Sequence, residues 1–332
     1  MYKINKKLHR IDWIYSEYAN VTTTSLSQFI TSINDTYYSN SANLYSSRFV
    51  SDIHREYENM FNSINIRNKI NMPYIVDIGG GTGFEYDLFK RFSLKFHHFK
   101  YIEPSKDMMG IFKKSLTKDK IDKLSFHNGH FSDVVDVIKE EPNKLLIINS
   151  ALHHIIWLEP MLDDIKASMK AGDLFVLGHE PNNNYSQILM FIQKLIRAVF
   201  STALLKRLPF LSRSRKNDVN RWNSINEELI KKGNINKKMS PLLIRRIIDY
   251  GVGYKNDWMK LNIPKEYNEG FWNAEDLSSY LGSDFNLLYY RTYRHIGDSR
   301  GNWVIEAINR LMGKLLKYQG TNFIAVWEKR SN

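Results

Sequence analysis

The sequence predicts an α/β protein in which a mostly parallel sheet is covered by helices on both faces. Two observations lead to this fold class. Short apolar runs alternate with helical patterns from residue 74 to about residue 177, as in parallel sheets with crossover helices. One of these runs leads directly into the glycine cluster 79–83, as in the strand–turn–helix units that bind nucleotides. In 332 residues we expect one large α/β core and additional helices.

Residues 1–70 are expected to form helices that precede the sheet. Apolar residues recur there at helical spacing, first Leu26, Phe29, Ile30 and Ile33, then Phe49, Ile53, Tyr57, Met60 and Phe61. A linker containing Asn71 and Pro73 follows. The first residues are followed by polar ones and not by an apolar run, so we expect no signal peptide.

The core begins at residue 71 and runs to residue 181. Its expected strands are 74–78, 99–102, 124–127, 145–150 and 174–177, and its expected helices are 83–92, 105–116, 134–139 and 160–170. Ligands of such sheets bind outside the carboxyl ends of the strands. The polar residues that fall at those ends are Asp77, Glu103, Asn128, Ser150 and Glu180.

The pattern changes between residues 182 and 270, which we expect to form a helical insertion. Residues 188–200 read as a long amphipathic helix, and a basic, polar stretch follows. A further helix begins at Ser240 and Pro241, a capping residue followed by proline at the first helical position, and ends near Gly251. Residues 273–281 then read as a capped helix, and 285–293 and 322–327 as strands of alternating character.

The glycine cluster and the acid that follows it resemble a known family. Asp77, Gly79, Gly81 and Gly83 occupy alternate positions, whereas dinucleotide sites use G-x-G-x-x-G. Glu103 ends the next strand, at the sequence distance from the loop where an acid accepts hydrogen bonds from ribose hydroxyls. This arrangement resembles motif I of the class I S-adenosylmethionine-dependent methyltransferases. The similarity continues through residues 145–155 and 170–174, and is weaker toward the C-terminal end of the chain.

The resemblance implies a Rossmann-like, doubly wound sheet, mostly parallel with an antiparallel last strand. It further implies an N-terminal helical cap over the cofactor (1–70), a core (71–181 with 271–332) and a helical lid (182–270). The implied enzyme transfers a methyl group from S-adenosylmethionine to an acceptor, releases S-adenosylhomocysteine and requires no metal.

The resemblance also assigns cofactor contacts. Gly79, Gly81 and Gly83 would hold the amino-acid part, Glu103 the ribose, and Asp77 and Ser150 would lie beside the cofactor. Asp77 could instead bind the loop's own N–H groups.

Many members of the family carry an aspartate after the third strand for the adenine amino group, and residues 127–133 match that pattern imperfectly. Asn128 or His130 could make this contact, or Phe131 could stack on the ring.

Methyl transfer places the acceptor atom about 3 Å from the methyl carbon, with a base where the acceptor carries a proton. His179 and Glu180 end the fifth strand, whose tip faces the methyl group in this architecture, and they are the first catalytic candidates. Glu180 could instead cap the following helix. His154 is the third candidate, although the Leu-His-His pattern of residues 152–154 recurs in members with unrelated substrates. Tyr37, Tyr38 and Tyr45 could close over the ligands.

The net charge of +12 suggests nucleic acid as a partner. However, residues 181–217 contain no Asp or Glu and include a strongly apolar helix. This pattern favours a lid whose apolar face covers an apolar or aromatic substrate. RNA is not favoured, because aromatic-interleaved RNA modules are missing from this segment. A basic amphipathic helix could also contact an anionic membrane. We expect O- or N-methylation of a small molecule, as in secondary metabolism. RNA or protein methylation, and a non-enzymatic cofactor-binding scaffold, are the alternatives.

The chain contains no cysteine, which excludes disulfides and thiolate metal sites and is compatible with a reducing, cytoplasmic location. The most apolar run, 188–205, is interrupted by Gln193, Lys194 and Arg197, so we expect no transmembrane segment.

Overall fold

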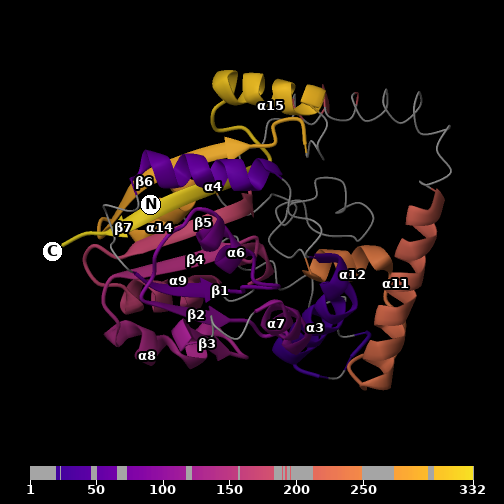
Figure 1. The fold of residues 1–332 in the computed structure, drawn as a ribbon. Coiled ribbons are helices and arrows are strands. Elements are labelled where there is room, and N and C mark those ends of the chain that lie inside the picture. The colour runs from indigo at the N-terminus through magenta and orange to yellow at the C-terminus, as the bar shows by residue number, and fades with distance from the viewer. Residues whose placement is uncertain are drawn as a thin grey trace.

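The fold is a seven-stranded sheet between two layers of helices (Figure 1). The computed structural model describes residues 20–22, 24–45, 51–65, 73–116, 122–155, 158–182, 189, 191–192, 195, 212–248, 273–297 and 303–331. The strands are β1 (Tyr74–Ile78), β2 (His98–Ile102), β3 (Leu124–His127), β4 (Lys144–Asn149), β5 (Leu174–Pro181), β6 (Phe285–Tyr293) and β7 (Asn322–Lys329).

The strand order is β3-β2-β1-β4-β5-β7-β6. Strands β1 to β5 are mutually parallel, whereas β7 runs antiparallel to both of its neighbours. This confirms the predicted sheet, including its antiparallel end. From β1 the chain adds β2 and β3 on one side, and then continues with β4 on the other side of β1. The crevice at such a switch, here between β1 and β4, is where ligands of doubly wound sheets bind.

Alternation along the strands gives each face of the sheet its own core. Val76 and Ile78 of β1 pack with α8 (Val135–Glu140), α9 (Leu158–Ser168) and α14 (Ala274–Leu281). Ile75 packs on the other face with α4 (Ser51–Ser63), α6 (Phe84–Arg91) and α7 (Lys106–Ser115). Because both faces are covered, the central strands are mostly apolar, with Asp77 of β1 as a buried exception.

Helix ends in the core follow the predicted capping residues. The Ser105 hydroxyl accepts from Met108 N at 3.4 Å at the start of α7, and Asn273 forms a capping box with Asp276 at the start of α14. Helix α6 starts directly after Gly83, whose φ is +89°. A Cβ at Gly83 would lie 2.1 Å from Phe112, so only glycine fits between α6 and α7.

Three helices gather beside the carboxyl ends of the strands: α3 (Leu26–Tyr45), α11 (Ser212–Lys231) and α12 (Pro241–Ile248) (Figure 1). Phe29 of α3, Ile225 of α11 and Ile244 of α12 are buried in one continuous core. The start of α12 at Pro241 is as predicted. Helix α11 was expected only as a polar stretch, but its apolar residues Trp222, Ile225 and Leu229 recur at helical spacing and pack inward.

The two N-terminal helices have different surroundings. Helix α3 contacts α7, α11 and α12, whereas α4 packs on the sheet against β6 and β7. Helix α15 (Trp303–Leu315) was not predicted, and it contacts β6. Most of the expected lid helix 188–200 lies outside the described residues, so the division into cap, core and lid stays a prediction. In the part of the chain that is described, no helix is long and apolar enough to span a membrane.

Candidate functional site

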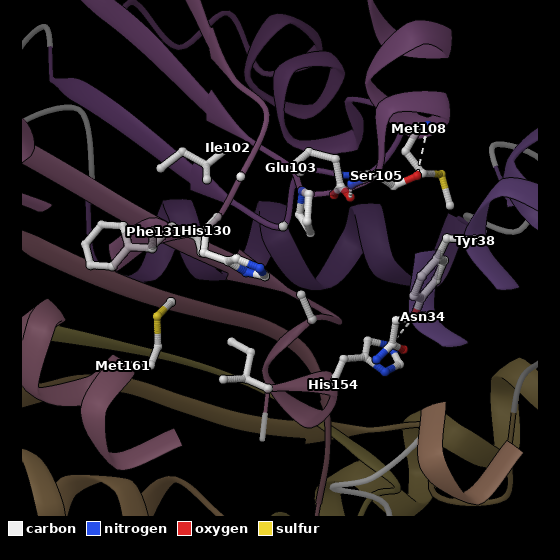
Figure 2. Close-up of a pocket in the computed structure, with 18 of the residues that line it drawn as sticks. Asn34, Tyr38, Ile102, Glu103, Ser105, Met108, His130, Phe131, His154 and Met161 are labelled. Carbon is white, nitrogen blue, oxygen red and sulfur yellow. Dashed lines mark hydrogen bonds between the residues drawn. The ribbon is translucent and has the colours of Figure 1, made fainter. Parts of the chain in front are cut away.

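A cavity of about 520 Å³ opens outside the carboxyl ends of the parallel strands (Figure 2). Its walls are the segments that follow β1, β2, β3 and β4, together with one face of α3 and the start of α9. Ile30, Asn34 and Tyr38 of α3, at a spacing of four residues, face it. The volume is typical of small-molecule sites, which measure roughly 300–1,000 Å³.

The glycine loop after β1 forms the floor of this cavity. Gly79 and Gly81 have φ of +72° and +55°, and a Cβ at Gly79 would lie 2.8 Å from that of Ala151. The N–H groups of Gly79 and Gly80 donate to Ile102 O at 2.9 and 3.2 Å, which fixes the loop to β2. Gly79 and Gly81 line the cavity as predicted, whereas Gly83 lies outside the lining and serves the packing of α6.

Glu103 occupies its predicted position at the end of β2 and lines the cavity. Its carboxylate accepts from Gly81 N at 2.9 Å and from Ser105 N at 2.8 Å. Burial raises the pKa of Glu103 to about 7, while these two backbone hydrogen bonds oppose the shift. One carboxylate therefore ties the glycine loop to the start of α7 at the edge of the cavity.

The three candidates after β3 separate into two groups. His130 and Phe131 line the cavity as expected. Asn128 does not, because its amide donates to Glu103 O at 2.9 Å and to Pro104 O at 2.8 Å, bracing the turn that carries Glu103. Phe131, Ile102 and Met161 together form an apolar wall (Figure 2).

His154 faces the cavity and is held at both ring nitrogens. Its Nε2 lies 2.5 Å from the Tyr38 hydroxyl (Figure 2), and its Nδ1 lies 2.6 Å from Ile248 O. A carbonyl only accepts, so Nδ1 carries the hydrogen and Nε2 accepts from Tyr38. Burial, with the adjacent His153, lowers the pKa of His154 well below its usual value. His154 is thus a neutral imidazole whose lone pair points toward the phenol on the cavity wall.

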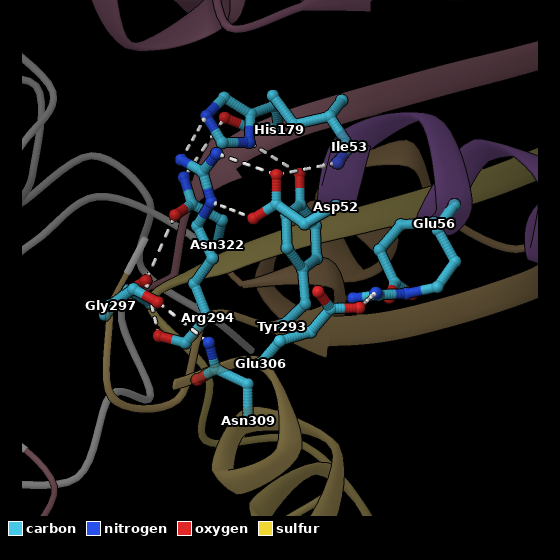
Figure 3. A network of polar contacts seen from close by, with 12 residues as sticks. Asp52, Ile53, Glu56, His179, Tyr293, Arg294, Gly297, Glu306, Asn309 and Asn322 are labelled. Atoms are coloured by element: carbon cyan, nitrogen blue, oxygen red, sulfur yellow. Dashed lines mark hydrogen bonds and ion pairs between the residues drawn. The ribbon is translucent and has the colours of Figure 1, made fainter. Parts of the chain in front are cut away.

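The expected positions of His179 and Glu180 are corrected by the structure, because neither residue lines the cavity. The pairing of β5 with β7 shifts register between Leu177 and Glu180, and His179 has φ of +56°. Such a bulge redirects the side chain. His179 Nδ1 lies 2.5 Å from the Tyr293 hydroxyl, and its Nε2 lies 3.2 Å from Arg294 (Figure 3).

Glu180 caps the turn after β4 and not, as its sequence position suggested, the helix that follows β5. Its carboxylate accepts from the N–H groups of Ala151, Leu152 and His153 at 2.8, 2.9 and 3.3 Å, and contacts His153 Nδ1 at 2.9 Å. It therefore stabilises the turn after β4, which presents Ser150 and His154 to the cavity.

Two further carboxylates near the glycine loop have oxygens without a hydrogen-bonding partner among the described residues. Asp77 is fully buried, and within the described residues neither of its oxygens has a partner. The alternative that Asp77 binds the loop's N–H groups is therefore wrong. Glu85 is 2% exposed, lines the cavity and has one unpartnered oxygen, Oε1. Sequence reasoning missed Glu85, although an acid three residues before Leu88 interrupts the apolar stripe of this helix.

The charge of the cavity is opposite to that of the chain. Asp35, Glu85, Glu103 and Asp164 line it, and none of the described residues that line it is Lys or Arg. The chain as a whole carries +12. A cationic ligand therefore fits this site better than a phosphate-rich one. Within the described residues, no cluster of three His, Asp or Glu could hold a metal ion.

The strand order with its antiparallel β7, the glycine loop after β1 and the acid after β2 are the arrangement that the sequence resemblance implies. The chain has the class I methyltransferase fold. No protein-family model matches the sequence, and no curated protein matches it.

Solved structures with this fold are similar to the chain. One is a SAM-dependent methyltransferase from Anabaena variabilis, with 14% sequence identity and a TM-score of 0.49 over 91% of this chain and 95% of that one. The plantazolicin methyltransferase BpumL, solved with SAH, has 13% identity and a TM-score of 0.43 over 92% and 98%. A methyltransferase from Mesorhizobium loti has 10% identity and a TM-score of 0.41 over 81% and 96%. Because these TM-scores are below 0.5, the fold assignment rests on the strand order of this chain and not on these likenesses.

Proposed function

We propose that the protein is an S-adenosylmethionine-dependent methyltransferase that acts on a small molecule. The observation that carries this proposal is the cavity beside the glycine loop, which four carboxylates line without any Lys or Arg among the described residues. S-adenosylmethionine brings two cations, the sulfonium and the α-ammonium, against one carboxylate. A nicotinamide dinucleotide brings a pyrophosphate, which this lining would repel.

The chain's own residues supply a place for each part of this cofactor. Gly79 and Gly81 lie where the amino-acid part would approach the backbone, and Glu103 accepts hydrogen bonds from the ribose. Ile102, Phe131 and Met161 offer the apolar wall for the adenine ring. When bound, S-adenosylmethionine supplies an electrophilic methyl group.

His154 is our candidate for the base, with Tyr38 beside it. The Ile248 carbonyl holds the proton of His154 on Nδ1, which leaves Nε2 to accept a proton. An acceptor hydroxyl or ammonium that replaces or joins the Tyr38 hydroxyl at Nε2 would give up its proton there. His179 is not placed for this role, because it lies outside the lining of the cavity, and Tyr293 and Arg294 contact its ring nitrogens.

A small acceptor is favoured over RNA by the same carboxylates, which would repel phosphates. Helix α3 also forms a wall of the cavity, which leaves less room for a large substrate.

Isothermal titration calorimetry tests the proposal. We expect S-adenosylhomocysteine to bind with micromolar affinity, and a nicotinamide dinucleotide to give no heat. Transfer of a labelled methyl group to amine- and phenol-bearing small molecules would then identify the acceptor class. Dinucleotide binding without S-adenosylhomocysteine binding would refute the cofactor. Methylation of RNA alone would refute the acceptor class.

A further inference from the structure

The carboxylates under the glycine loop form an acidic group without a counter-ion among the described residues. Asp77 on β1 is 0% exposed, Glu85 on α6 is 2% exposed and Glu103 after β2 is 7% exposed. Glu103 uses its oxygens on two backbone N–H groups. In contrast, both oxygens of Asp77 and Oε1 of Glu85 have no partner in the described structure. An unpaired buried carboxylate is costly, so such a group either holds a proton or receives a cation.

None of the described neighbouring elements supplies that cation. From α4, the Tyr57 hydroxyl donates to Asn149 Oδ1 at 2.8 Å, and the His54 ring stacks on Phe84. From β2, the Tyr101 hydroxyl donates to Gly81 O, and from β4 the Asn149 amide hydrogen-bonds Glu85. Asp87, on the outer side of α6, adds a further negative charge. The groups that these elements direct at the pair are thus phenols, an amide and acids, and burial lowers the pKa of His54.

Of the two carboxylates with unpartnered oxygens, Glu85 is the one that a ligand can reach. It lines the cavity next to Phe84 and Asn149, on the same side as Gly79 and Gly81. Asp77 lies behind the loop, where its Oδ2 is 2.5 Å from the position that a Cβ on Gly80 would take. A cation held between the glycine loop and α6 would therefore meet Glu85 directly, with the charge of Asp77 behind it.

We infer that Glu85 is the counter-ion of the cofactor's α-ammonium group, and that it gives up a proton to solvent when the cofactor binds. This inference rests on the proposed function. The ammonium keeps its three hydrogens and replaces the proton as the positive charge beside the carboxylate. Binding is then an exchange of one cation for another, and the protein avoids a bare buried charge in either state.

The electrostatics of the site agree with this exchange. Burial raises the pKa of Glu85 to about 8, although a backbone hydrogen bond and the Asn149 amide favour the charged form. Burial, with the nearby charges of Glu85 and Glu103, also raises the pKa of Asp77. At pH 7, below this pKa of about 8, Glu85 is mostly protonated. Nearly one proton is therefore available for release.

Calorimetry of two ligands tests the inference. S-adenosylhomocysteine carries the α-ammonium, whereas 5′-methylthioadenosine has the same nucleoside and thioether without the amino-acid part. In phosphate and in Tris at pH 7, the S-adenosylhomocysteine heats should differ by the two buffers' ionisation enthalpies for most of one proton from Glu85, in addition to what Glu103 releases when the ribose binds. The buffer difference should be smaller for methylthioadenosine, which reaches Glu103 but not Glu85. The affinity for S-adenosylhomocysteine should rise almost tenfold from pH 6 to pH 7.

The variant Glu85→Gln keeps the size of the side chain and removes its titration. We expect it to lose the proton release that comes from Glu85, with its pH dependence, and to bind S-adenosylhomocysteine about tenfold more weakly at pH 8. Its unchanged affinity for methylthioadenosine would show that the cavity is intact. Asp87→Asn, an exposed acid of the same helix whose charge has only a small influence on Glu85, is the matched control and should keep both the proton release and the pH dependence.

The possible failures are distinguishable. If S-adenosylhomocysteine shows no larger buffer difference than methylthioadenosine, or if Glu85→Gln releases as much proton as the wild type, the inference about Glu85 is wrong and the proposed function stands. If neither ligand binds at all, both fall together.

Discussion

Two histidines lie at the ends of neighbouring strands, and the structure gives them opposite surroundings. His154 follows β4 and faces the cavity, with its Nε2 accepting from Tyr38. His179, near the end of β5, lies in a buried polar network with Tyr293, Arg294 and Asp52 (Figure 3). Both are neutral, because burial lowers the pKa of each well below its usual value.

The comparison shows that a position at a strand tip does not by itself make a catalytic residue. Arg294 donates to Asp52 at 2.7 and 3.1 Å, and Asp52 also accepts from Ile53 N at 2.9 Å. His179 completes this cluster, which connects α4 to the end of β6. His154 instead has Nδ1 anchored on the Ile248 carbonyl, and its Nε2 accepts from the Tyr38 hydroxyl at the wall of the cavity. The surroundings of His154 suit proton transfer, whereas those of His179 suit stabilisation of the fold.

The largest effect is expected from replacing the cavity histidine. His154→Gln should lower turnover by a factor of about 10²–10⁴, the usual contribution of a general base, while S-adenosylhomocysteine affinity stays near the wild-type value. Turnover is measured with whichever acceptor the labelled-methyl screen identifies. His179→Gln is the matched comparison and should keep most of the activity. If His179→Gln lowers turnover more than His154→Gln does, then the base is on β5 and not at His154.

The second largest effect concerns the network. Asp52→Asn leaves the Arg294 guanidinium without its counter-ion in a site where the two side chains are only 12% and 6% exposed. We expect the free energy of unfolding in urea to fall by about 3 kcal/mol, with no change in S-adenosylhomocysteine affinity.

The control for that experiment is an exposed ion pair. Glu227 and Lys238 are 3.8 Å apart with side chains 68% and 60% exposed, so Glu227→Gln should change stability by less than about 0.5 kcal/mol. A loss of ligand affinity in Asp52→Asn, without a loss of stability, would place the network in the binding site.

The sheet and the glycine loop were predictable because their signals are local. The periods that mark a strand or a helix are complete within one element, and Glu103 lies at a fixed sequence distance from Gly83. Helix α15 was missed although its sequence is amphipathic. Its apolar Trp303, Leu311 and Leu315 remain exposed within the described structure, so burial in the core does not account for them.

The surroundings of the histidines depend on contacts that no local pattern encodes. Tyr38 and His154 are 116 residues apart in the sequence, and Ile248 follows His154 by 94. The contact of His179 with Arg294 spans 115 residues and depends on a bulge in β5. From sequence alone, both histidines lie at the same edge of the sheet, and only the packing of α3, α12 and β6 distinguishes them.

Two buried glutamates, Glu103 and Glu180, also differ in whether they face the cavity, and the effects expected from replacing them are smaller. Glu103 lines the cavity, whereas Glu180 lies off it and caps the turn after β4. Glu103→Ala should weaken S-adenosylhomocysteine binding by about 1–3 kcal/mol, the usual loss for a charged hydrogen-bonding group. Glu180→Gln should lower thermal stability more than ligand affinity, because it weakens the cap. Calorimetry and thermal unfolding of both variants measure this, and equal losses of affinity would contradict the assignment.

The smallest effect is one that the two histidines should share. In the folded protein both have a lowered pKa, so below pH 6.5 the unfolded chain takes up protons that the folded chain excludes. Each histidine therefore contributes stability that is present above pH 6.5 and is lost as the pH falls below it. Between pH 7.5 and pH 5.5 the loss amounts to about 1.4 kcal/mol for each.

Urea unfolding at these two pH values measures the shared effect. His154→Gln and His179→Gln should each remove one such contribution from the acid sensitivity of the wild type, whereas His130→Gln, at an exposed position, should leave it unchanged. The raised pKa of Glu85 has the opposite effect, since this group makes the folded state more stable as the pH falls. Each variant must therefore be compared with the wild type at the same pH. If only one of the two buried histidines alters this pH dependence, then the other is protonated in the folded state, and its neutral role in the comparison is wrong.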